Sequence, residues 1–286
     1  MIQPLQGLSE LAGSYDTLFS DVWGVIHNGR ESFPEPCEAL ARWRERHGPV
    51  ILISNSPRPS PEVIVQLDGL GVPREAWSAI VTSGDVTREL LAARAPARVF
   101  RIGPERDAPL YAGLDLTLAP LESADFISCT GPTDDDVETP EDYRTLLIEA
   151  VSRRLPLICA NPDKVVQRGD RLIYCGGALA DLYEQLGGET IMAGKPYRPI
   201  YDACLAKAGA LAGAPAERAR VLAIGDGVAT DARGAADQGL DLLFIAGGIH
   251  AVESLDAAGA LDLAATTALL KRSGLAARYA MTQLAW

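Results

Sequence analysis

The sequence predicts an α/β protein with a Rossmann-like parallel sheet and a second αβ domain inserted into it. Short apolar runs such as Val50–Ser54 (VILIS) and Val221–Gly225 (VLAIG) alternate with segments of helical period. Continuous apolar strands separated by helices are typical of a parallel sheet that is covered on both faces. In such a sheet, ligands bind at the carboxyl ends of the strands.

The core domain is predicted from two blocks of elements. Leu40, Trp43 and His47 share one face of the first helix, which Gly48 ends, and Ser60 with Pro61 opens the second helix. The predicted elements are, in order, Thr17–Trp23 (strand), Pro36–Arg46 (helix), Val50–Ser54 (strand), Ser60–Leu70 (helix), Ala79–Thr82 (strand), Tyr197–Gly209 (helix), Val221–Gly225 (strand), Thr230–Gly239 (helix) and Asp241–Ile245 (strand).

A second αβ set separates these blocks. Its predicted elements are Gly84–Arg94 (helix), Arg98–Ile102 (strand), Asp125–Cys129 (strand), Pro140–Arg153 (helix), Pro156–Ala160 (strand) and Gly177–Leu186 (helix). The Gly, Pro and Asp content of Gly131–Thr139 marks a loop. We therefore predict a core domain over 1–83 and 190–286 and an inserted domain over 84–189.

Composition indicates a globular protein that does not bind nucleic acid. The 286 residues carry a net charge of −12, which repels nucleic acid and anionic membranes. An anionic substrate would need a local positive site, such as a lysine or a metal ion. The five cysteines include no C-x-x-C pair, which favours buried, reduced thiols. With no signal-peptide pattern at the start and no long apolar run, we expect a cytoplasmic protein without a membrane span.

Polar residues follow several of the predicted strands. Asp21 follows the first strand and Ser54 the second, Asp226 and Asp231 follow a later strand, and Lys195 precedes a helix. All of them would face one edge of a parallel sheet. Three carboxylates together form an oxygen-ligand site for a hard cation such as Mg²⁺, while a serine and a lysine can hold phosphoryl oxygens. This set suits phosphoryl transfer.

The order of these motifs resembles that of the haloacid dehalogenase superfamily. The sequence contains D-x-x-G-V at Asp21, S-N at Ser54, G-K-P around Lys195 and G-D-x-x-x-T-D at 225–231. The long insert with A-N-P-D at 160–163 resembles the subfamily with a type-II αβ cap, which includes pyridoxal, nitrophenyl and phosphoglycolate phosphatases. The resemblance covers nearly the whole chain.

The resemblance implies a role for each motif residue. Asp21 would attack phosphorus and become an aspartyl phosphate, and Lys195 would neutralise charge on the phosphoryl oxygens. The implied Mg²⁺ ligands are the Asp21 carboxylate, the backbone carbonyl of Trp23 and Asp226, and Asp231 would bind a metal water or orient Lys195. The implied substrate-binding residues are Ser54, Asn55, Asn161, Asp163 and His27. The implied substrate is a small phosphorylated metabolite, and a homodimer through the cap is plausible by the same resemblance.

Trp23 departs from the family pattern. Phosphatases of this superfamily usually carry a second Asp there, which protonates the leaving oxygen and then activates water. An indole N–H is only a donor and cannot do this chemistry, although the backbone carbonyl remains available to a metal. Loss of a general acid typically costs about 10²–10⁴ in rate.

Three interpretations follow from Trp23. In the first, the substrate has a good leaving group, such as an acyl or aryl phosphate. In the second, His27, His250 or Asp163 replaces the acid, with His27 favoured. In the third, the protein binds a phosphorylated ligand with little turnover. Dehalogenases of the superfamily also carry an aromatic residue two places after the nucleophile. They need no metal, so the retained Asp226, Asp231 and Lys195 favour phosphate esters over C–halogen bonds.

Overall fold

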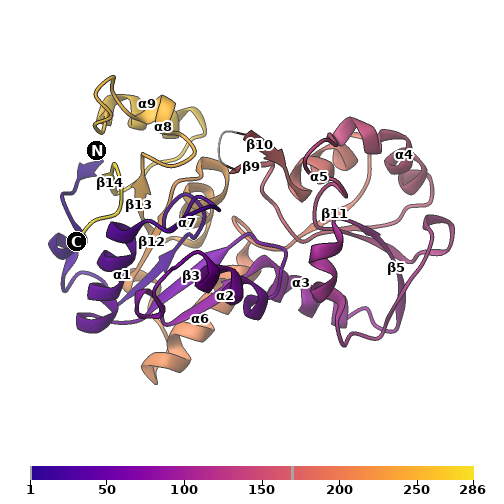
Figure 1. Cartoon of the computed structure of the whole chain (residues 1–286), viewed down its shortest axis with the longest axis horizontal. Coiled ribbons are helices and arrows are strands. Elements are labelled where there is room, and N and C mark those ends of the chain that lie inside the picture. The colour runs from indigo at the N-terminus through magenta and orange to yellow at the C-terminus, as the bar shows by residue number, and fades with distance from the viewer. Residues whose placement is uncertain (1, 169–170) are drawn as a thin grey trace. The chain divides into compact units, whose positions relative to one another are not determined.

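The chain divides into two compact units in the computed structural model, which describes residues 2–168 and 171–286 (Figure 1). The first unit comprises Met1–Ser54, Ile64–Val81 and Tyr201–Trp286, and the second comprises Asn55–Val63 and Thr82–Ile200. The insert predicted for 84–189 lies within the second unit. That unit also takes in 55–63, 82–83 and 190–200, so it is larger than the predicted insert.

A seven-stranded sheet forms the centre of the first unit. Its strands, in spatial order, are β1 (Gln3–Pro4), β14 (Tyr279–Met281), β13 (Asp241–Ile245), β12 (Val221–Gly225), β2 (Thr17–Ser20), β3 (Val50–Ser54) and β4 (Ala79–Thr82). β2 pairs in parallel with β12 on one side and with β3 on the other. The carboxyl ends of these three strands therefore lie side by side.

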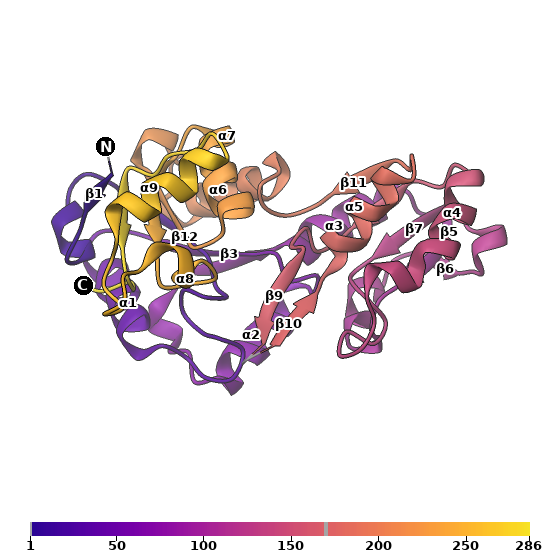
Figure 2. The same cartoon turned by 90° about the horizontal axis from the view of Figure 1, so that it is seen from above.

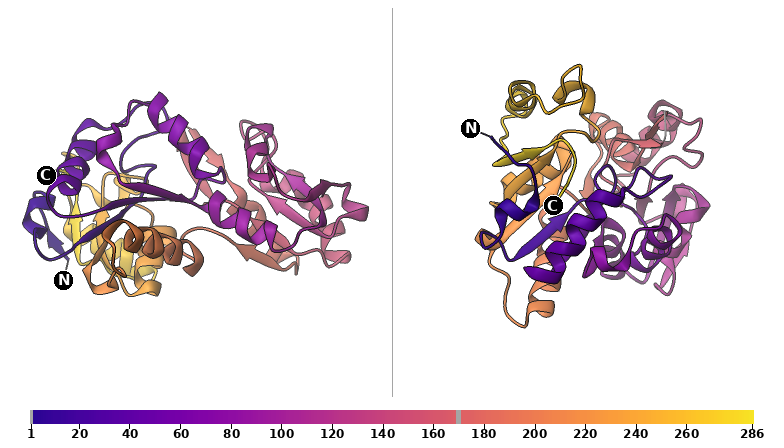
Figure 3. Two further views of the ribbon diagram at one scale, coloured as in Figure 1. Left: turned by 90° about the horizontal axis from the view of Figure 1, so that it is seen from below. Right: turned by 60° about the vertical axis from the view of Figure 1, so that its left-hand side comes forward.

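Helices cover both faces of this sheet, as the left-hand view of Figure 3 shows. They are α1 (Pro34–Arg46), α2 (Ser60–Gly69), α6 (Arg198–Ala212), α7 (Arg233–Gln238), α8 (Ala251–Ser254) and α9 (Leu263–Arg272). The helix predicted from Thr230 instead begins with a π-helical turn, Val228–Ala232, and becomes α-helical at Arg233. The α/β prediction is confirmed.

The second unit has a five-stranded parallel sheet of its own. Its strands, in spatial order, are β11 (Thr190–Met192), β8 (Leu157–Cys159), β7 (Phe126–Cys129), β5 (Ala97–Ile102) and β6 (Leu116–Leu118). A separate antiparallel pair joins β9 (Val165–Arg168) to β10 (Arg171–Tyr174). Its helices are α3 (Ser83–Ala92), α4 (Arg144–Ser152) and α5 (Gly176–Gln185), the last two visible together in Figure 2.

Alternating side chains give this second sheet two apolar faces. Ile127 and Leu157 pack into one core with residues of α4 and α5. Phe126 and Ile158, their neighbours in sequence, pack into the opposite core with Leu91 of α3. This alternation is the two-residue period of a strand, and it explains why both strands read as continuous apolar runs.

The predicted domain boundary at residue 189 is wrong by one strand. Thr190–Met192 forms β11 and pairs in parallel with β8, so these residues complete the second sheet. Lys195 consequently follows a strand of the second sheet and belongs to the second unit. The sequence instead predicts that Lys195 faces the same sheet edge as the three carboxylates.

Two expectations from composition can be compared with the structure. None of the five cysteines, all of which are among the described residues, forms a disulfide, and all five side chains are buried. Within the described residues, no helix has the length and apolar character that crossing a membrane requires.

Candidate active site

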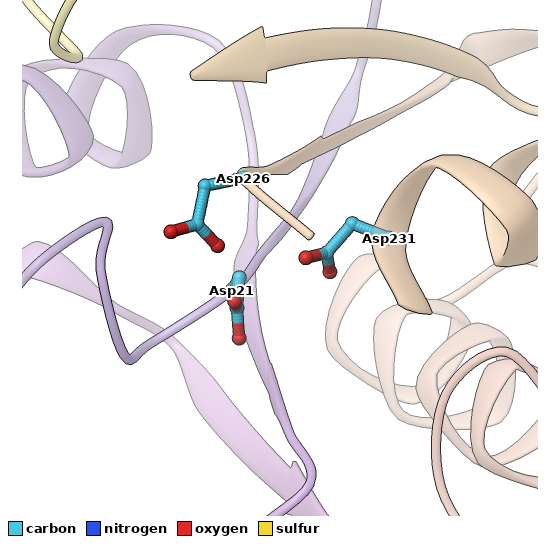
Figure 4. A group of neighbouring side chains, drawn as sticks. All are labelled: Asp21, Asp226 and Asp231. Atoms are coloured by element: carbon cyan, nitrogen blue, oxygen red, sulfur yellow. The ribbon is translucent and has the colours of Figure 1, made fainter. Parts of the chain in front are cut away.

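Three carboxylates meet at the carboxyl ends of β2 and β12. Asp21 directly follows β2, Asp226 directly follows β12, and Asp231 lies in the π-helical turn after it. One oxygen from each lies within 4.8 Å of the others, and Figure 4 shows the three side chains converging. The residues are only 8%, 5% and 4% exposed, respectively. The predicted convergence of the strand ends is therefore present in the first unit.

A backbone N–H orients one oxygen of each carboxylate. Asp21 Oδ1 accepts a hydrogen bond from Val22 N–H at 2.7 Å. Asp226 Oδ2 accepts one from Ile249 N–H at 2.7 Å, and Asp231 Oδ2 accepts one from Gly227 N–H at 3.0 Å. Hydrogen bonds to a carboxylate favour its charged form, and they fix its rotation.

Two glycines make room for Asp226. A Cβ atom at Gly24 would lie 2.2 Å from Asp226 Oδ2, and one at Gly248 would lie 1.9 Å from the same atom. Gly24 also has a φ of +82°, which disfavours any side chain. Gly24 belongs to the D-x-x-G-V motif that begins at Asp21, whereas Gly248 was not predicted from the sequence. The available signal was the Gly-Gly pair at 247–248, which directly follows Ala246 after the buried strand β13.

The cluster fits a hard divalent cation. Three buried carboxylates within 4.8 Å repel one another, and such crowding is costly unless positive charge compensates it. All the donor atoms are oxygens, which Mg²⁺ prefers, and Mg²⁺ is commonly bound through one or two carboxylates together with water and substrate phosphate.

Trp23 is fixed within the loop that follows Asp21. The loop is closed by a hydrogen bond from Gly24 N–H to the His27 carbonyl at 2.9 Å. The indole packs against Gly29, where a Cβ atom would lie 2.4 Å from Trp23 Cη2. It also meets the His27 ring edge-on, with the ring centroids 5.2 Å apart. The indole is partly exposed and occupies the position of the usual second Asp.

His27 is poorly suited to replace that missing acid. It is 2% exposed, and its Nδ1 accepts a hydrogen bond from Gly29 N–H at 3.0 Å. Burial lowers the pKa of His27 to about 4, because desolvation disfavours the imidazolium. At neutral pH the ring is therefore uncharged and serves to shape the loop. His250, the second histidine considered, pairs with Glu253 across 3.3 Å.

Ser54 and Lys195 are both buried. Ser54 is the last residue of β3, in the strand that pairs with β2, and is 8% exposed. Lys195 lies in the loop between β11 and α6 and is 2% exposed. Lysine is almost never buried this completely unless it is paired, so its depth is consistent with a functional ammonium.

The remaining predicted residues lie together in the second unit. The Asn55 side chain contacts the backbone of Lys195 and the carboxylate of Asp163. Asn161 Oδ1 accepts a hydrogen bond from Asp163 N–H at 3.2 Å, which closes a turn within the A-N-P-D motif. The predicted site residues thus form two groups: Asp21, Trp23, His27, Ser54, Asp226 and Asp231 in the first unit, and Asn55, Asn161, Asp163 and Lys195 in the second.

Two family profiles match the chain. The profile described as haloacid dehalogenase-like hydrolase matches residues 18–117, and a second, described as HAD-hydrolase-like, matches residues 192–269. The first match includes Asp21 and Ser54, and the second includes Lys195, Asp226 and Asp231. The family predicted from the motifs is confirmed.

Similar proteins are known from several organisms. A crystal structure of a haloacid dehalogenase-like hydrolase from Brucella suis 1330 is 49% identical, covers 98% of this chain and 99% of its own, and superposes with a TM-score of 0.88. A p-nitrophenyl phosphatase from Archaeoglobus fulgidus is 20% identical over 94% of this chain and 97% of its own, with a TM-score of 0.71. The 5'-nucleotidase YutF of Bacillus subtilis is 22% identical over 82% of this chain and 89% of its own.

Proposed function

The chain belongs to the haloacid dehalogenase-like hydrolase family, and on this premise we propose that it is a Mg²⁺-dependent phosphatase that acts on a small phosphorylated metabolite. The observation that carries the proposal is the buried cluster of Asp21, Asp226 and Asp231, whose oxygens lie within 4.8 Å of one another. The similarity to a p-nitrophenyl phosphatase and to a 5'-nucleotidase supports phosphate monoesters as the substrate class.

Asp21 is the proposed nucleophile. Its carboxylate attacks phosphorus to give an aspartyl phosphate while the leaving oxygen departs, and water then attacks that phosphorus, which releases phosphate and restores the carboxylate. The Val22 N–H holds one oxygen of Asp21 at 2.7 Å and so fixes the carboxylate's direction. Held in one orientation, the carboxylate loses less entropy when it reacts.

Asp21, Asp226 and the backbone carbonyl of Trp23 would hold the metal, and Asp231 would bind a metal water or orient Lys195. When bound, Mg²⁺ offsets the negative charge that otherwise keeps a phosphate away from a carboxylate. We assign Ser54 and Lys195 to the phosphoryl oxygens, the first as a hydrogen-bond donor and the second as a compact positive charge. Asn161 and Asp163 are the proposed substrate-binding residues of the second unit.

Trp23 makes us propose a substrate with a good leaving group. The indole has no proton to give at neutral pH, and His27 is uncharged there because burial lowers its pKa to about 4. An acyl or aryl phosphate needs little protonation of its leaving oxygen, whereas an alkyl phosphate needs much. The absence of an acid at position 23 also favours a second candidate, a protein that binds a phosphorylated ligand with little turnover.

The test compares phosphate release from acetyl phosphate and from a simple alkyl phosphate, with Mg²⁺ and after chelation, using Asp21→Asn as the blank. We expect Mg²⁺-dependent release from acetyl phosphate and at least about 10²-fold less from the alkyl ester. Equal rates on both would show that another residue supplies the proton. No release above the blank would favour the binding protein, which should then bind inorganic phosphate in a Mg²⁺-dependent manner.

A further inference from the structure

We propose that Asn55 is a positioning residue: its side-chain amide joins the Lys195 loop to Asp163 and does not itself bind the phosphoryl group. The inference rests on the proposed function, because Lys195 matters only if it meets an anion. It replaces the expectation from sequence that Asn55 contacts phosphoryl oxygens. Asp163 lies 108 positions after Asn55 in the sequence, and Lys195 lies 140 positions after it. All three residues belong to the second unit.

The amide of Asn55 is fully used by hydrogen bonds within the protein. Its Oδ1 accepts from Lys195 N–H at 2.7 Å, and its Nδ2 donates to the Lys195 carbonyl at 3.2 Å. The same nitrogen donates to Asp163 Oδ1 at 2.9 Å. Because Nδ2 carries two hydrogens, both donors are committed, and the side chain has none left for a phosphate.

The packing around the amide is tight. Asn55 is 4% exposed. A Cβ atom at Gly194 would lie 2.6 Å from Asn55 Oδ1 and 2.8 Å from Ser83 Oγ. The backbone of the Lys195 loop therefore packs directly against the Asn55 amide, with no room for a side chain at position 194. Gly194 has a φ of +94°, which glycine adopts without strain. Only glycine allows the two-point contact between Asn55 and the Lys195 peptide groups.

Asp163 is the fixed end of this connection. Its N–H is held by Asn161, and its carbonyl accepts from Gly177 N–H at 3.0 Å at the start of α5. A Cβ atom at Gly177 would lie 2.2 Å from the Pro162 carbonyl oxygen, so the turn sits directly on the first residues of the helix. Asn55 therefore ties the Lys195 loop to a turn that is already anchored by its own backbone.

The hydrogen bond between Asn55 and Asp163 can be tested by exchanging the two side chains. Asn55→Asp keeps the acceptor for Lys195 N–H but removes both donors and places two carboxylates face to face. Asp163→Asn supplies an amide that can donate to the new carboxylate. The double variant therefore restores the bond between the side chains with its polarity reversed. An Asn55 that bound phosphate would not be rescued in this way, because the introduced carboxylate would still repel the phosphoryl oxygens.

The experiment measures kcat and KM for acetyl phosphate with Mg²⁺ in the wild type, Asn55→Asp, Asp163→Asn and the double variant. We expect Asn55→Asp to lose about 10–100-fold in kcat/KM, the cost typical of an outer-shell partner. The double variant should recover at least about tenfold of that loss. Losses that multiply, so that the double variant is no better than Asn55→Asp, would overturn the proposal. Asp134→Asn, the same change on an exposed loop residue, is the control and should leave kcat/KM unchanged.

A second measurement separates this inference from the proposed function. Amide hydrogen exchange over 193–197 reports the Lys195 N–H, which donates to Asn55, and we expect it to accelerate severalfold in Asn55→Ala. Unchanged exchange would contradict the inference even in an active enzyme. If the wild type releases no phosphate above the Asp21→Asn blank, the proposed function fails, while exchange at Lys195 still decides whether Asn55 holds that loop.

Discussion

The residues at the carboxyl ends of the strands differ between the two sheets, although both sheets are parallel and have apolar central strands. In the first unit, β2 and β12 lead into Asp21, Asp226 and Asp231, which are buried and crowded together. In the second unit, β7 and β8 end in Cys129 and Cys159, which are neutral. Burying like charges destabilises a fold, whereas burying thiols does not. The three carboxylates of the proposed metal site therefore all follow strands of the first sheet, whereas Lys195 follows β11 of the second.

The largest effect should come from Asp21→Asn, which removes the proposed nucleophile and one of the three charges. Loss of a nucleophile typically costs at least about 10⁴-fold in kcat, and phosphate release from acetyl phosphate measures it. Thermal unfolding with and without Mg²⁺ then measures how much Asp21 contributes to metal binding.

Magnesium should stabilise the wild type more than it stabilises Asp21→Asn. A ligand at about 100 times its Kd adds about 2.7 kcal/mol to the free energy of unfolding, and the wild type should gain more of this than Asp21→Asn. An equal gain in Tm with Mg²⁺ in both proteins would contradict a metal site that includes Asp21.

A second effect should come from Trp23→Asp, which restores the usual acid beside the cluster. We expect turnover of an alkyl phosphate to rise by about 10²–10⁴-fold relative to Trp23→Asn. The Asn variant is the matched control, since it loses the same indole packing on Gly29 and His27 but has no proton to transfer. Equal rates for the two variants would show that the missing acid does not limit this enzyme.

A smaller effect should come from Gly248→Ala. The new Cβ would lie 1.9 Å from Asp226 Oδ2 and would push the carboxylate off the Ile249 N–H that holds it. Displacing a group that orients a ligand typically costs about 10–100-fold in metal affinity, which calorimetric titration with Mg²⁺ would measure. Gly69→Ala is the control, because a Cβ there has nothing within 4 Å. Equal Mg²⁺ affinity in both variants would exclude Gly248 from shaping the site.

Much of the fold could be predicted because the central strands have a clear pattern. Val50–Ser54, Ala79–Thr82, Val221–Gly225 and Asp241–Ile245 begin and end where the sequence predicted. Each contains a continuous apolar run, and burial on both faces of the sheet demands such runs. Thr190–Met192 was missed, and its existence as a strand depends on pairing with β8.

The site could be predicted only as far as neighbouring strand ends determine it. Asp21 and Asp226 follow paired parallel strands, so their approach follows from topology. The contact of Ile249 N–H with Asp226 depends on how a loop 23 residues away turns back, and no local pattern encodes that. Likewise, S-N indicated a phosphate contact for Asn55, whereas its amide bonds to Lys195, 140 residues away.

The smallest expected effect concerns the cysteines at the ends of β7 and β8. Burial raises the pKa of Cys129 to about 12 and that of Cys159 well above its usual value, because desolvation disfavours the thiolate. A raised pKa keeps a thiol protonated, so at pH 8 thiol reagents should modify Cys129 at least about 10³-fold more slowly than free cysteine, whose pKa is about 8.5, and should modify Cys159 slowly as well. Unfolding in guanidinium should make all five cysteines reactive. Mass spectrometry locates the modified cysteines. Rapid labelling of the native protein at Cys129 or Cys159 would mean that the ends of β7 and β8 open to solvent. The contrast between a charged and a neutral sheet end would then no longer explain why only the first sheet carries the proposed metal site.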